Sequence, residues 1–169
     1  MNIEVTDESE QMPPPGEVER LLAAASTRLG ASDAATLARA SARMYSWARA
    51  IPGAVTACAH EADGLVGFGY GYTWRWDAMS DAWALRLRDH LGAASGQLDN
   101  TFAVVLLVVA PHQRRAGLGA RLLTGLADHA DEGRAWLQAD AGSPLHATCM
   151  SLGWHALDPV ADPVIMLGG

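Results

Sequence analysis

The stretch VVAPHQRRAGLGARLLTGL, residues 108–126, joins an apolar run to a helix-like repeat through a turn that contains two arginines and two glycines. The run that leads into it, 101–110, is short, continuous and rich in β-branched residues, which predicts a strand covered on both faces. The leucine repeat that follows predicts an amphipathic helix over 118–130. The turn therefore lies where a buried strand enters a helix.

This turn has the chemistry of an anion-binding corner. The first amides of a helix have no intrahelical acceptor, and the helix dipole favours a negative charge beside them. Gly117 and Gly119 remove side chains that would keep a phosphate from the backbone, and Arg114 and Arg115 add charge-assisted donors. The turn matches neither a P-loop nor a dinucleotide fingerprint. It is predicted to bind pyrophosphate, and the alternative is an ordinary strand–helix turn with glycines for tightness.

The composition excludes several classes of function. A chain of 169 residues suits one domain with a single core, and its net charge of −7 gives nothing that attracts a phosphate backbone. We therefore expect no nucleic-acid partner. The acidity either favours a cationic substrate or is an ordinary property of soluble proteins. Cys58 and Cys149 are too far apart in the sequence for a typical zinc site or disulfide framework, so no metal is expected.

The chain shows no targeting or membrane signal. Its N-terminus, MNIEVTDESEQ, is acidic and lacks the basic start and apolar core of a signal peptide. The longest apolar run, 102–110, is about half the length that a membrane-spanning helix needs. We therefore expect a cytoplasmic protein without a membrane partner, and a homodimer stays open.

The remaining elements follow from local patterns. Expected strands occupy 2–6, 54–61, 65–74, 101–110, 134–140, 154–159 and 162–168, and expected helices occupy 17–29, 32–50, 79–91, 118–130 and 144–153. Ser32 is the expected N-cap of the second helix, Met79 begins the apolar stripe of the third, and 93–100 is expected to be a loop. The order β-α-α-β-β-α-β-α-β-α-β-β predicts one mixed α/β domain over 1–169, in which 1–16 is partly flexible or a short first strand.

Two stretches resemble signatures of one known superfamily. VVAPHQRRAGLGARLL resembles the acetyl-coenzyme A motif of the GCN5-related N-acetyltransferases (GNAT), which is Arg/Gln-x-x-Gly-x-Gly/Ala after a strand that ends in Val-x-Pro. In this chain the motif falls on Arg114, Gly117 and Gly119. SPLHATCMSLGW is similar to the family's last helix, which closes in a Leu-Gly-Phe-like tripeptide, here 152–154. GFGYGYTW fits the family's third strand, and the element order agrees over nearly the whole chain.

The resemblance implies a GNAT fold, which is a mixed central sheet of six to seven strands flanked by helices, with an extra helix between strands 3 and 4. It implies acetyl-CoA or another short acyl-CoA as cosubstrate, with the pyrophosphate on the amides of 114–120. The pantetheine arm pairs with the strand at 107–109, where that strand separates from its neighbour, and the Val109 amide is the implied oxyanion donor. The cosubstrate-binding residues so implied are Leu107, Val108, Val109, Arg114, Arg115, Ala116, Gly117, Leu118, Gly119 and Ala120.

Two positions depart from the family pattern. Many relatives carry a glutamate three residues before the Val of Val-x-Pro, and this position is Leu106. Many also carry a tyrosine four residues before the Gly of Leu-Gly-Phe, and this position is Cys149. Both usual catalytic groups are therefore replaced, which leaves acyl-CoA binding better supported than catalysis.

Three side chains are candidate catalytic substitutes, each with a structural alternative. Asp140 ends a strand beside the expected cleft and could accept a proton or bind a cationic acceptor, or it is a turn former. His146 could act as a general base or is a solvated helix residue. Cys149 could donate a proton or is a buried inert thiol. His112, in the turn, is expected to be exposed.

Aromatic residues suggest where an acceptor binds. Trp74, Trp76 and Trp83 cluster where relatives often form the acceptor wall, and they could enclose an apolar or aromatic amine or pack in the core. The expected function is transfer of an acetyl or small acyl group from acyl-CoA to a small-molecule amine by direct attack. One alternative is a degenerate GNAT domain that binds acyl-CoA as a sensor or interaction partner. A third, an α/β interaction module without CoA, requires the glycine turn to be coincidental.

Overall fold

A computed structural model describes residues 2–26, 30–130, 133–158, 161 and 163–169. The strands are β1 (Glu4–Thr6), β2 (Val55–Glu61), β3 (Gly64–Trp74), β4 (Thr101–Val109), β5 (Ala135–Ala139), β6 (His155–Ala156) and β7 (Val164–Gly168). The α-helices are α1 (Pro15–Ala25), α2 (Ala31–Ala48), α3 (Ala82–Leu91), α4 (Leu118–Ala127) and α5 (Pro144–Ser151), and short 3₁₀ segments occupy Trp76–Ala78, Gly92–Leu98 and Pro111–Gln113.

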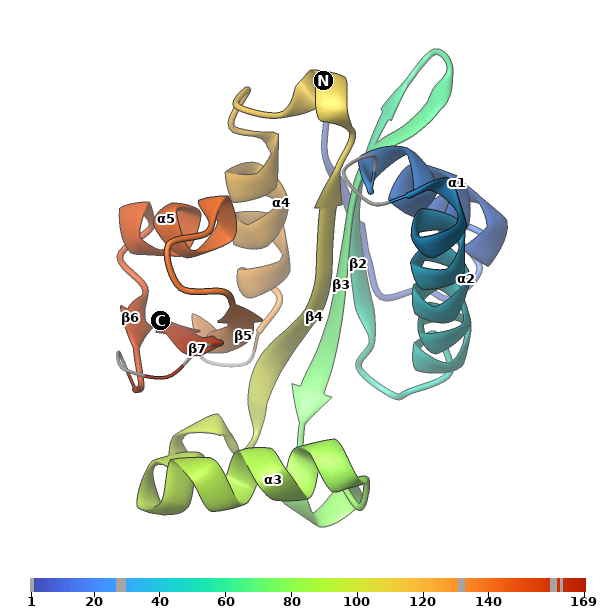
Figure 1. The fold of residues 1–169 in the computed structure, drawn as a ribbon. Helices are drawn as coiled ribbons and strands as arrows, with labels where there is room; N and C mark the ends of the chain where they lie inside the picture. Colours follow the sequence, from blue (N-terminus) through green and yellow to red (C-terminus); the bar gives the residue numbers. More distant parts are fainter. Residues whose placement is uncertain (1, 27–29, 131–132, 159–160, 162) are drawn as a thin grey trace.

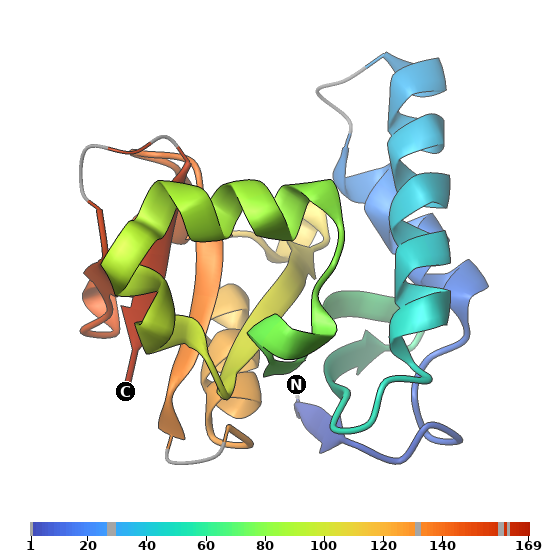
Figure 2. The same cartoon turned by 90° about the horizontal axis from the view of Figure 1, so that it is seen from below.

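The strands form one sheet with the order β1-β2-β3-β4-β5-β7-β6 (Figure 1). Every neighbouring pair is antiparallel except β4 and β5, which are parallel. Helices α1 and α2 cover one face of the sheet, and α4 and α5 cover the other. Helix α3 crosses the ends of β3 and β4, as the view from below shows (Figure 2). The predicted fold class, a mixed sheet with an extra helix between the third and fourth strands, is confirmed.

Alternation along β3 explains how the helices pack on the sheet. Gly67 and Gly69 lie under α4, where an added Cβ would lie 3.0 Å from Leu122 Cδ1 and 2.9 Å from Leu126 Cδ1, respectively. The missing side chains let α4 approach the sheet backbone closely. An added Cβ at Gly71 would clash with the Ala103 carbonyl oxygen of β4 and would lie 2.5 Å from Cε1 of the Phe102 ring, so this glycine leaves room for the neighbouring backbone and for a core side chain.

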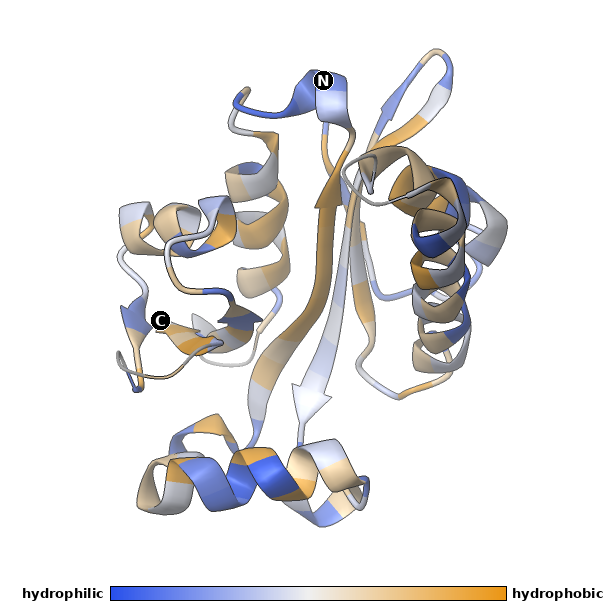
Figure 3. Ribbon diagram, in the orientation of Figure 1, coloured by the Kyte–Doolittle hydropathy of each residue, from blue (hydrophilic) through white to orange (hydrophobic). Residues whose placement is uncertain are grey.

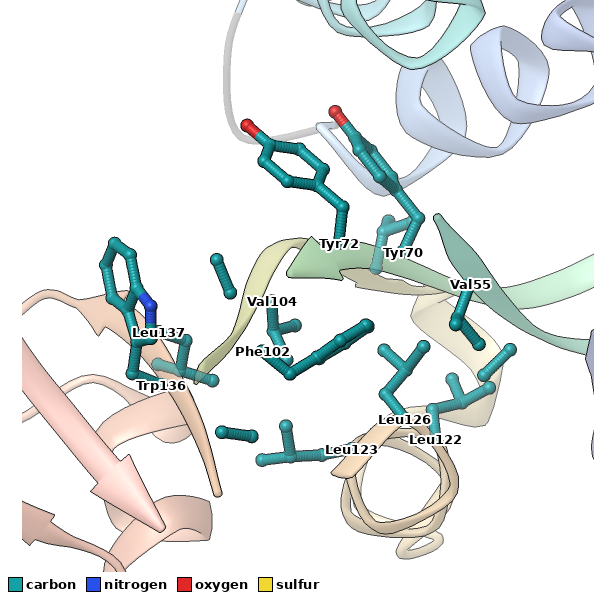
Figure 4. Packing of buried hydrophobic residues seen from close by; sticks show 14 of the residues in the cluster. Val55, Tyr70, Tyr72, Phe102, Val104, Leu122, Leu123, Leu126, Trp136 and Leu137 are labelled. Atoms are coloured by element: carbon teal, nitrogen blue, oxygen red, sulfur yellow. The ribbon is translucent and has the colours of Figure 1, made fainter. Parts of the chain in front are cut away.

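Aromatic residues of β3 alternate with these glycines and point to the opposite face. Phe68, Tyr70, Tyr72 and Trp74 are all buried. Figure 4 shows Tyr70 and Tyr72 on one side of the sheet and the α4 leucines on the other. Tyr45 of α2 packs edge-on against Phe68, with ring centroids 4.9 Å apart. The period of two in GFGYGYTW therefore matches a strand whose faces carry different layers.

Strands β4 and β5 pair only at their beginnings. The paired residues are Phe102 with Ala135 and Ala103 with Trp136, after which the two strands diverge. The first half of β4 is buried, whereas the side chain of Val105 is 38% exposed. The prediction of a strand covered on both faces is therefore wrong for the second half of β4, although that strand is hydrophobic along most of its length (Figure 3).

Several predicted element ends differ from the structure. Helix α2 begins after Gly30, which makes no side-chain cap, and Ser32 lies inside the helix. Met79 has an extended backbone, and α3 begins after Asp81, whose carboxylate accepts bonds from the Trp83 and Ala84 amides. The predicted loop at 93–100 is mostly a 3₁₀ segment. The predicted helix end at 27–29 and strand ends at 159 and 162 lie outside the described residues.

Candidate functional site

The corner before α4 exposes backbone donors. Gly117 is the N-cap with φ +74° and makes no side-chain cap, a left-handed conformation that glycine adopts without strain. The first bond of the helix runs from the Arg121 amide to the Gly117 carbonyl. The amides of Leu118, Gly119 and Ala120 therefore have no acceptor within the helix. An added Cβ at Gly119 would meet only Val109 Cγ2, at 3.8 Å, so internal packing does not require a glycine there.

Two arginines shape this corner differently. Arg115 is exposed and has φ +69°, which costs energy for a residue with a side chain. The guanidinium of Arg114 donates to the Ala25 carbonyl at the end of α1, at 2.6 Å, and its amide donates to the Pro111 carbonyl. Arg114 therefore ties the corner to α1. Of the amides predicted to bind pyrophosphate, that of Arg114 already has a protein acceptor.

His112 lies in the same turn and faces the β2–β3 hairpin. Its Nε2 is 3.1 Å from Glu61 Oε2, and the Gln113 side chain donates to Oε1 of the same carboxylate. His112 is exposed, as predicted. These contacts fix the turn on the hairpin rather than direct the imidazole toward β5.

The open edge of β4 presents backbone amides. The Ala110 amide donates to the Val66 carbonyl of β3, at 2.8 Å. Because amides alternate along a strand, those of Leu107 and Val109 point away from β3. This is the side from which β5 has diverged. The edge can therefore pair with an extended polar chain, and it runs directly into the corner before α4.

A cavity of about 620 Å³ lies on the α2 and α3 side of the sheet, where β4 and β5 separate. Its lining comes from α2, β3, β4, β5 and the segment around the start of α3, and most of it is apolar. The lining residues are Met44, Trp47, Tyr72, Trp74, Met79, Asp81, Trp83, Ala103, Val104, Val105, Trp136, Gln138, Asp140 and Pro163. No arginine or histidine is among them.

Trp74 is the centre of an aromatic cluster at this cavity. It makes edge-to-face contacts with Trp76, Trp83 and Trp136, with centroid distances of 5.2, 5.8 and 5.2 Å. Trp76 donates its indole N–H to the Ser95 carbonyl and does not line the cavity, so it is a core residue. Trp74 and Trp83 do line it, and Trp136 joins them from β5.

Two carboxylates and one phenol give the cavity its polarity. Asp81 caps α3 through its Oδ1, and Asp140 follows β5 with an exposed side chain. Burial raises the pKa of the Tyr72 hydroxyl, and the nearby negative charge of Asp81 raises it further. Tyr72 therefore stays protonated at neutral pH and can donate a hydrogen bond. Asp140 is the one predicted catalytic residue that lines the cavity.

The other two predicted catalytic residues lie elsewhere. Cys149 is fully buried on α5, and burial raises the pKa of its thiol to about 11. His146 is half-buried, and its Nδ1 accepts the Gly142 amide at 3.2 Å. Neither lines the cavity. The structure therefore does not bring Asp140, His146 and Cys149 together around one cavity.

The sequence reasoning missed three polar residues of the cavity, Tyr72, Asp81 and Gln138. Asp81 carries a local signal, because SDAW places an acidic N-cap candidate before a helix. The alternation along β3 places Tyr72 on the same face as Trp74, the residue that was singled out. Gln138 has no such signal, since its position depends on how far β5 diverges from β4.

Within the described ranges, no group of three histidine, cysteine, aspartate or glutamate side chains is arranged to hold a metal ion. None of the helices in the described part of the chain is long and apolar enough to cross a bilayer.

The chain matches known proteins in its fold but not in its sequence. No protein-family profile matches the chain, and no curated protein matches its sequence. Among solved structures, the chain is similar to the PaiA N-acetyltransferase from Thermoplasma acidophilum in complex with coenzyme A, with a TM-score of 0.61 and 10% identity over 99% of this chain and 98% of that one. A GNAT-family acetyltransferase from Bacillus cereus gives a TM-score of 0.60 and 13% identity over 99% and 97% of the two chains.

A third similar structure is the ribosomal-protein-S18-alanine N-acetyltransferase from Escherichia coli, with a TM-score of 0.58 and 12% identity over 98% of this chain and 90% of that one. The separation of β4 from β5, the glycine corner before α4 and the whole order of elements agree with this likeness. The chain therefore has the fold of the GCN5-related N-acetyltransferases.

Proposed function

We propose that the protein is an acyl-CoA-dependent N-acyltransferase that moves an acetyl or small acyl group to a small-molecule amine. The observation that carries the proposal is the continuity of three features. The donor corner at 117–120 adjoins the open edge of β4, and that edge runs to the cavity at Val105. A phosphate, an extended arm and an acceptor can be bound along this single path.

The residues present fit acyl-CoA. The amides of Leu118, Gly119 and Ala120 lack helical acceptors, and the glycine at 119 leaves them uncovered. The amides of Leu107 and Val109 face the open edge and would pair with the pantetheine arm, and that of Val109 is the proposed oxyanion donor. Arg115 is the exposed cation beside the phosphates, whereas Arg114 positions the turn through Ala25.

The cavity would bind the amine that accepts the acyl group. In direct transfer, the amine nitrogen bonds to the acyl carbon, the carbon–sulfur bond breaks, the amine loses a proton, and the thiolate takes one up. Asp140 lines the cavity and is the proposed proton acceptor, directly or through water. Tyr72 is a protonated hydroxyl in the same cavity, whereas Cys149 is buried away from it.

The second candidate function is a degenerate GNAT domain that binds acyl-CoA as a sensor. Leu106 and Cys149 favour it, since they replace the glutamate and tyrosine of many relatives. General acid–base help is typically worth about 10²- to 10⁴-fold, so losing it slows a reaction without abolishing it. We therefore favour a slow enzyme over a sensor.

Calorimetry with acetyl-CoA, followed by a thiol-release screen across amine classes, tests the proposal. Binding at micromolar affinity with amine-dependent thiol release would support the enzyme. Binding without release on any amine would select the sensor. Absence of binding would refute both.

A further inference from the structure

The acceptor cavity selects for a particular kind of amine, and this inference rests on the proposed function. The cavity is bounded by Trp74 and Trp83 on one side and by Trp136 of β5 on another, with Trp47 and Met44 contributed by α2. Trp83 is 41% exposed and Trp47 is 66% exposed, so large aromatic surfaces remain available at its mouth. An apolar or aromatic body would bury this surface.

The charged groups of the cavity are few and of one sign. Asp81 and Asp140 are its charged residues, Gln138 is its amide side chain, and Tyr72 adds one hydroxyl. A polyamine needs several carboxylates along its length, and an aminoglycoside needs many donors and acceptors around its rings. This lining offers neither. One ammonium group attached to an apolar body fits it better.

The two carboxylates have different roles. Asp81 Oδ1 accepts the Trp83 and Ala84 amides at 2.9 and 3.0 Å, so its charge is partly offset by the amino end of α3. Asp140 follows β5 beside the open edge of β4, where the acyl group would lie. Asp140 is therefore the group that can hold an ammonium next to the reacting carbon.

The indole nitrogens of Trp74 and Trp136 are shielded from the cavity. The Nε1 atoms of Trp74 and Trp136 are buried and have no hydrogen-bond partner in the protein, and both indoles line the cavity. Figure 4 shows the Trp136 nitrogen turned toward β4. A buried N–H without a partner is rare, and each one calls for an explanation. The face of an aryl ring is negatively polarised and accepts such donors, and Trp74 and Trp136 meet edge to face with ring centroids 5.2 Å apart, so contacts within the aromatic cluster offer the explanation. An acceptor in the cavity would meet the ring carbons of these indoles and not their N–H groups.

We infer that the acceptor is an arylalkyl monoamine, whose ring lies among Trp74, Trp83 and Trp136 and whose ammonium pairs with Asp140. Cation–π attraction from the same indoles adds to the ion pair. A larger peptide or nucleic acid is not required to fill a cavity of about 620 Å³.

Binding of four probes, measured by calorimetry, tests the inference without requiring turnover. 2-Phenylethylamine carries both the ring and the charge, butylamine lacks the ring, 2-phenylethanol lacks the charge, and spermidine has additional charges. We expect 2-phenylethylamine to bind at least about tenfold more tightly than each of the others. Equal or tighter binding of spermidine or butylamine would overturn the inference.

Matched variants locate the binding. Trp83→Ala should weaken the binding of 2-phenylethylamine about 5- to 30-fold. Leu85→Ala should leave that binding unchanged, because Leu85 is a 51% exposed residue of the same helix and lies outside the cavity. Asp140→Asn should weaken it about 3- to 10-fold, whereas the equal loss of charge in Asp89→Asn should not. If the two control variants weaken binding as much as the two cavity variants, the assigned site is wrong.

Thiol release from acetyl-CoA separates this inference from the proposed function. Turnover of spermidine or an aminoglycoside, together with no binding of 2-phenylethylamine, would overturn the inference and leave acyl transfer intact. Binding of 2-phenylethylamine that depends on Trp83 and Asp140, without any thiol release, would support the assignment of the cavity as an arylalkyl-amine site and refute the enzyme.

Discussion

Replacing Gly119 should separate acyl-CoA binding from folding. Gly119 is the second residue of α4, and an added Cβ would contact only Val109 Cγ2 at an ordinary 3.8 Å. A side chain is therefore tolerated by the protein itself. Glycine is among the poorest helix formers, so Gly119→Ala should raise the free energy of unfolding by about 0.5 to 1 kcal/mol, and Gly119→Val by less.

The effect on the ligand should be opposite. A valine side chain would stand over the amides of 118–120 and hold a phosphate away from them. Each charge-assisted bond is worth about 1.5 to 3 kcal/mol, so losing two of them predicts at least about 100-fold weaker acetyl-CoA binding for Gly119→Val. Gly119→Ala should bind far better, because the signature that this corner resembles accepts alanine at that position.

Calorimetry with acetyl-CoA and thermal unfolding, run on the same samples, measure the two effects. Gly16→Val is the matched control, since Gly16 is the second residue of α1 and has no atom within 4 Å of a built Cβ. The control should leave the affinity for acetyl-CoA unchanged. Unchanged affinity in Gly119→Val would refute the phosphate corner and, with it, the proposed function.

Three further outcomes are expected. Arg114→Ala should lower the melting temperature and weaken acetyl-CoA binding only a few-fold, because its guanidinium bonds Ala25; a loss above about tenfold that disappears at high salt would instead make it a direct phosphate ligand. The turnover rate should rise with pH toward the pKa of the amine. If the pH–rate profile instead showed a titration step near neutral pH, and His146→Ala removed that step, His146 would be identified as the base. Cys149→Ala should leave kcat within a few-fold, and the native thiol should resist alkylation, because burial raises its pKa to about 11 and keeps it protonated. The neutral buried thiol contributes stability that is complete below the pKa of a cysteine in the unfolded chain, near 8.5, and is lost as the pH rises through about 11. The free energy of unfolding should therefore fall less steeply with alkaline pH in Cys149→Ala than in the native protein.

Mass spectrometry gives the Cys149 prediction a clear readout. The chain contains no lysine, since all 12 of its basic residues are arginine. A stable acetyl adduct on the protein would therefore not be confused with acetylated lysine. Such an adduct on Cys149 would contradict direct transfer and require a covalent intermediate.

Features fixed by local chemistry were predictable from the sequence. The turn at 114–119 could be located because an apolar, β-branched run followed by glycines and a leucine repeat predicts a strand that enters a helix. The aromatic and glycine alternation of β3 predicted a strand, and the order of elements followed from similar short-range patterns. These patterns were sufficient to predict a mixed α/β domain, and the resemblance of two motifs to the GNAT superfamily supplied the rest of the fold class.

Features that depend on tertiary arrangement were not predictable. The apolar run of β4 looks the same whether protein or a ligand covers its second half, so the exposure of Val105 could not be foreseen. Met79 continues the spacing of the α3 stripe, but the Asp81 cap starts the helix later. Asp140 lines the cavity whereas His146 and Cys149 do not, and this difference depends on tertiary packing that no local pattern encodes.

The glycines of β3 help to set where the first turn of α4 lies. Leucine methyl groups of α4 occupy the space that side chains at Gly67 and Gly69 would need, so no room remains between the helix and the sheet at these two positions. A methyl group added at Gly69 would lift the middle of the helix and tilt its amino end. The position of the amides at 118–120, which we propose bind phosphate, is thus set in part by β3. A substitution in that strand should change the affinity for acyl-CoA while every residue of the turn stays the same.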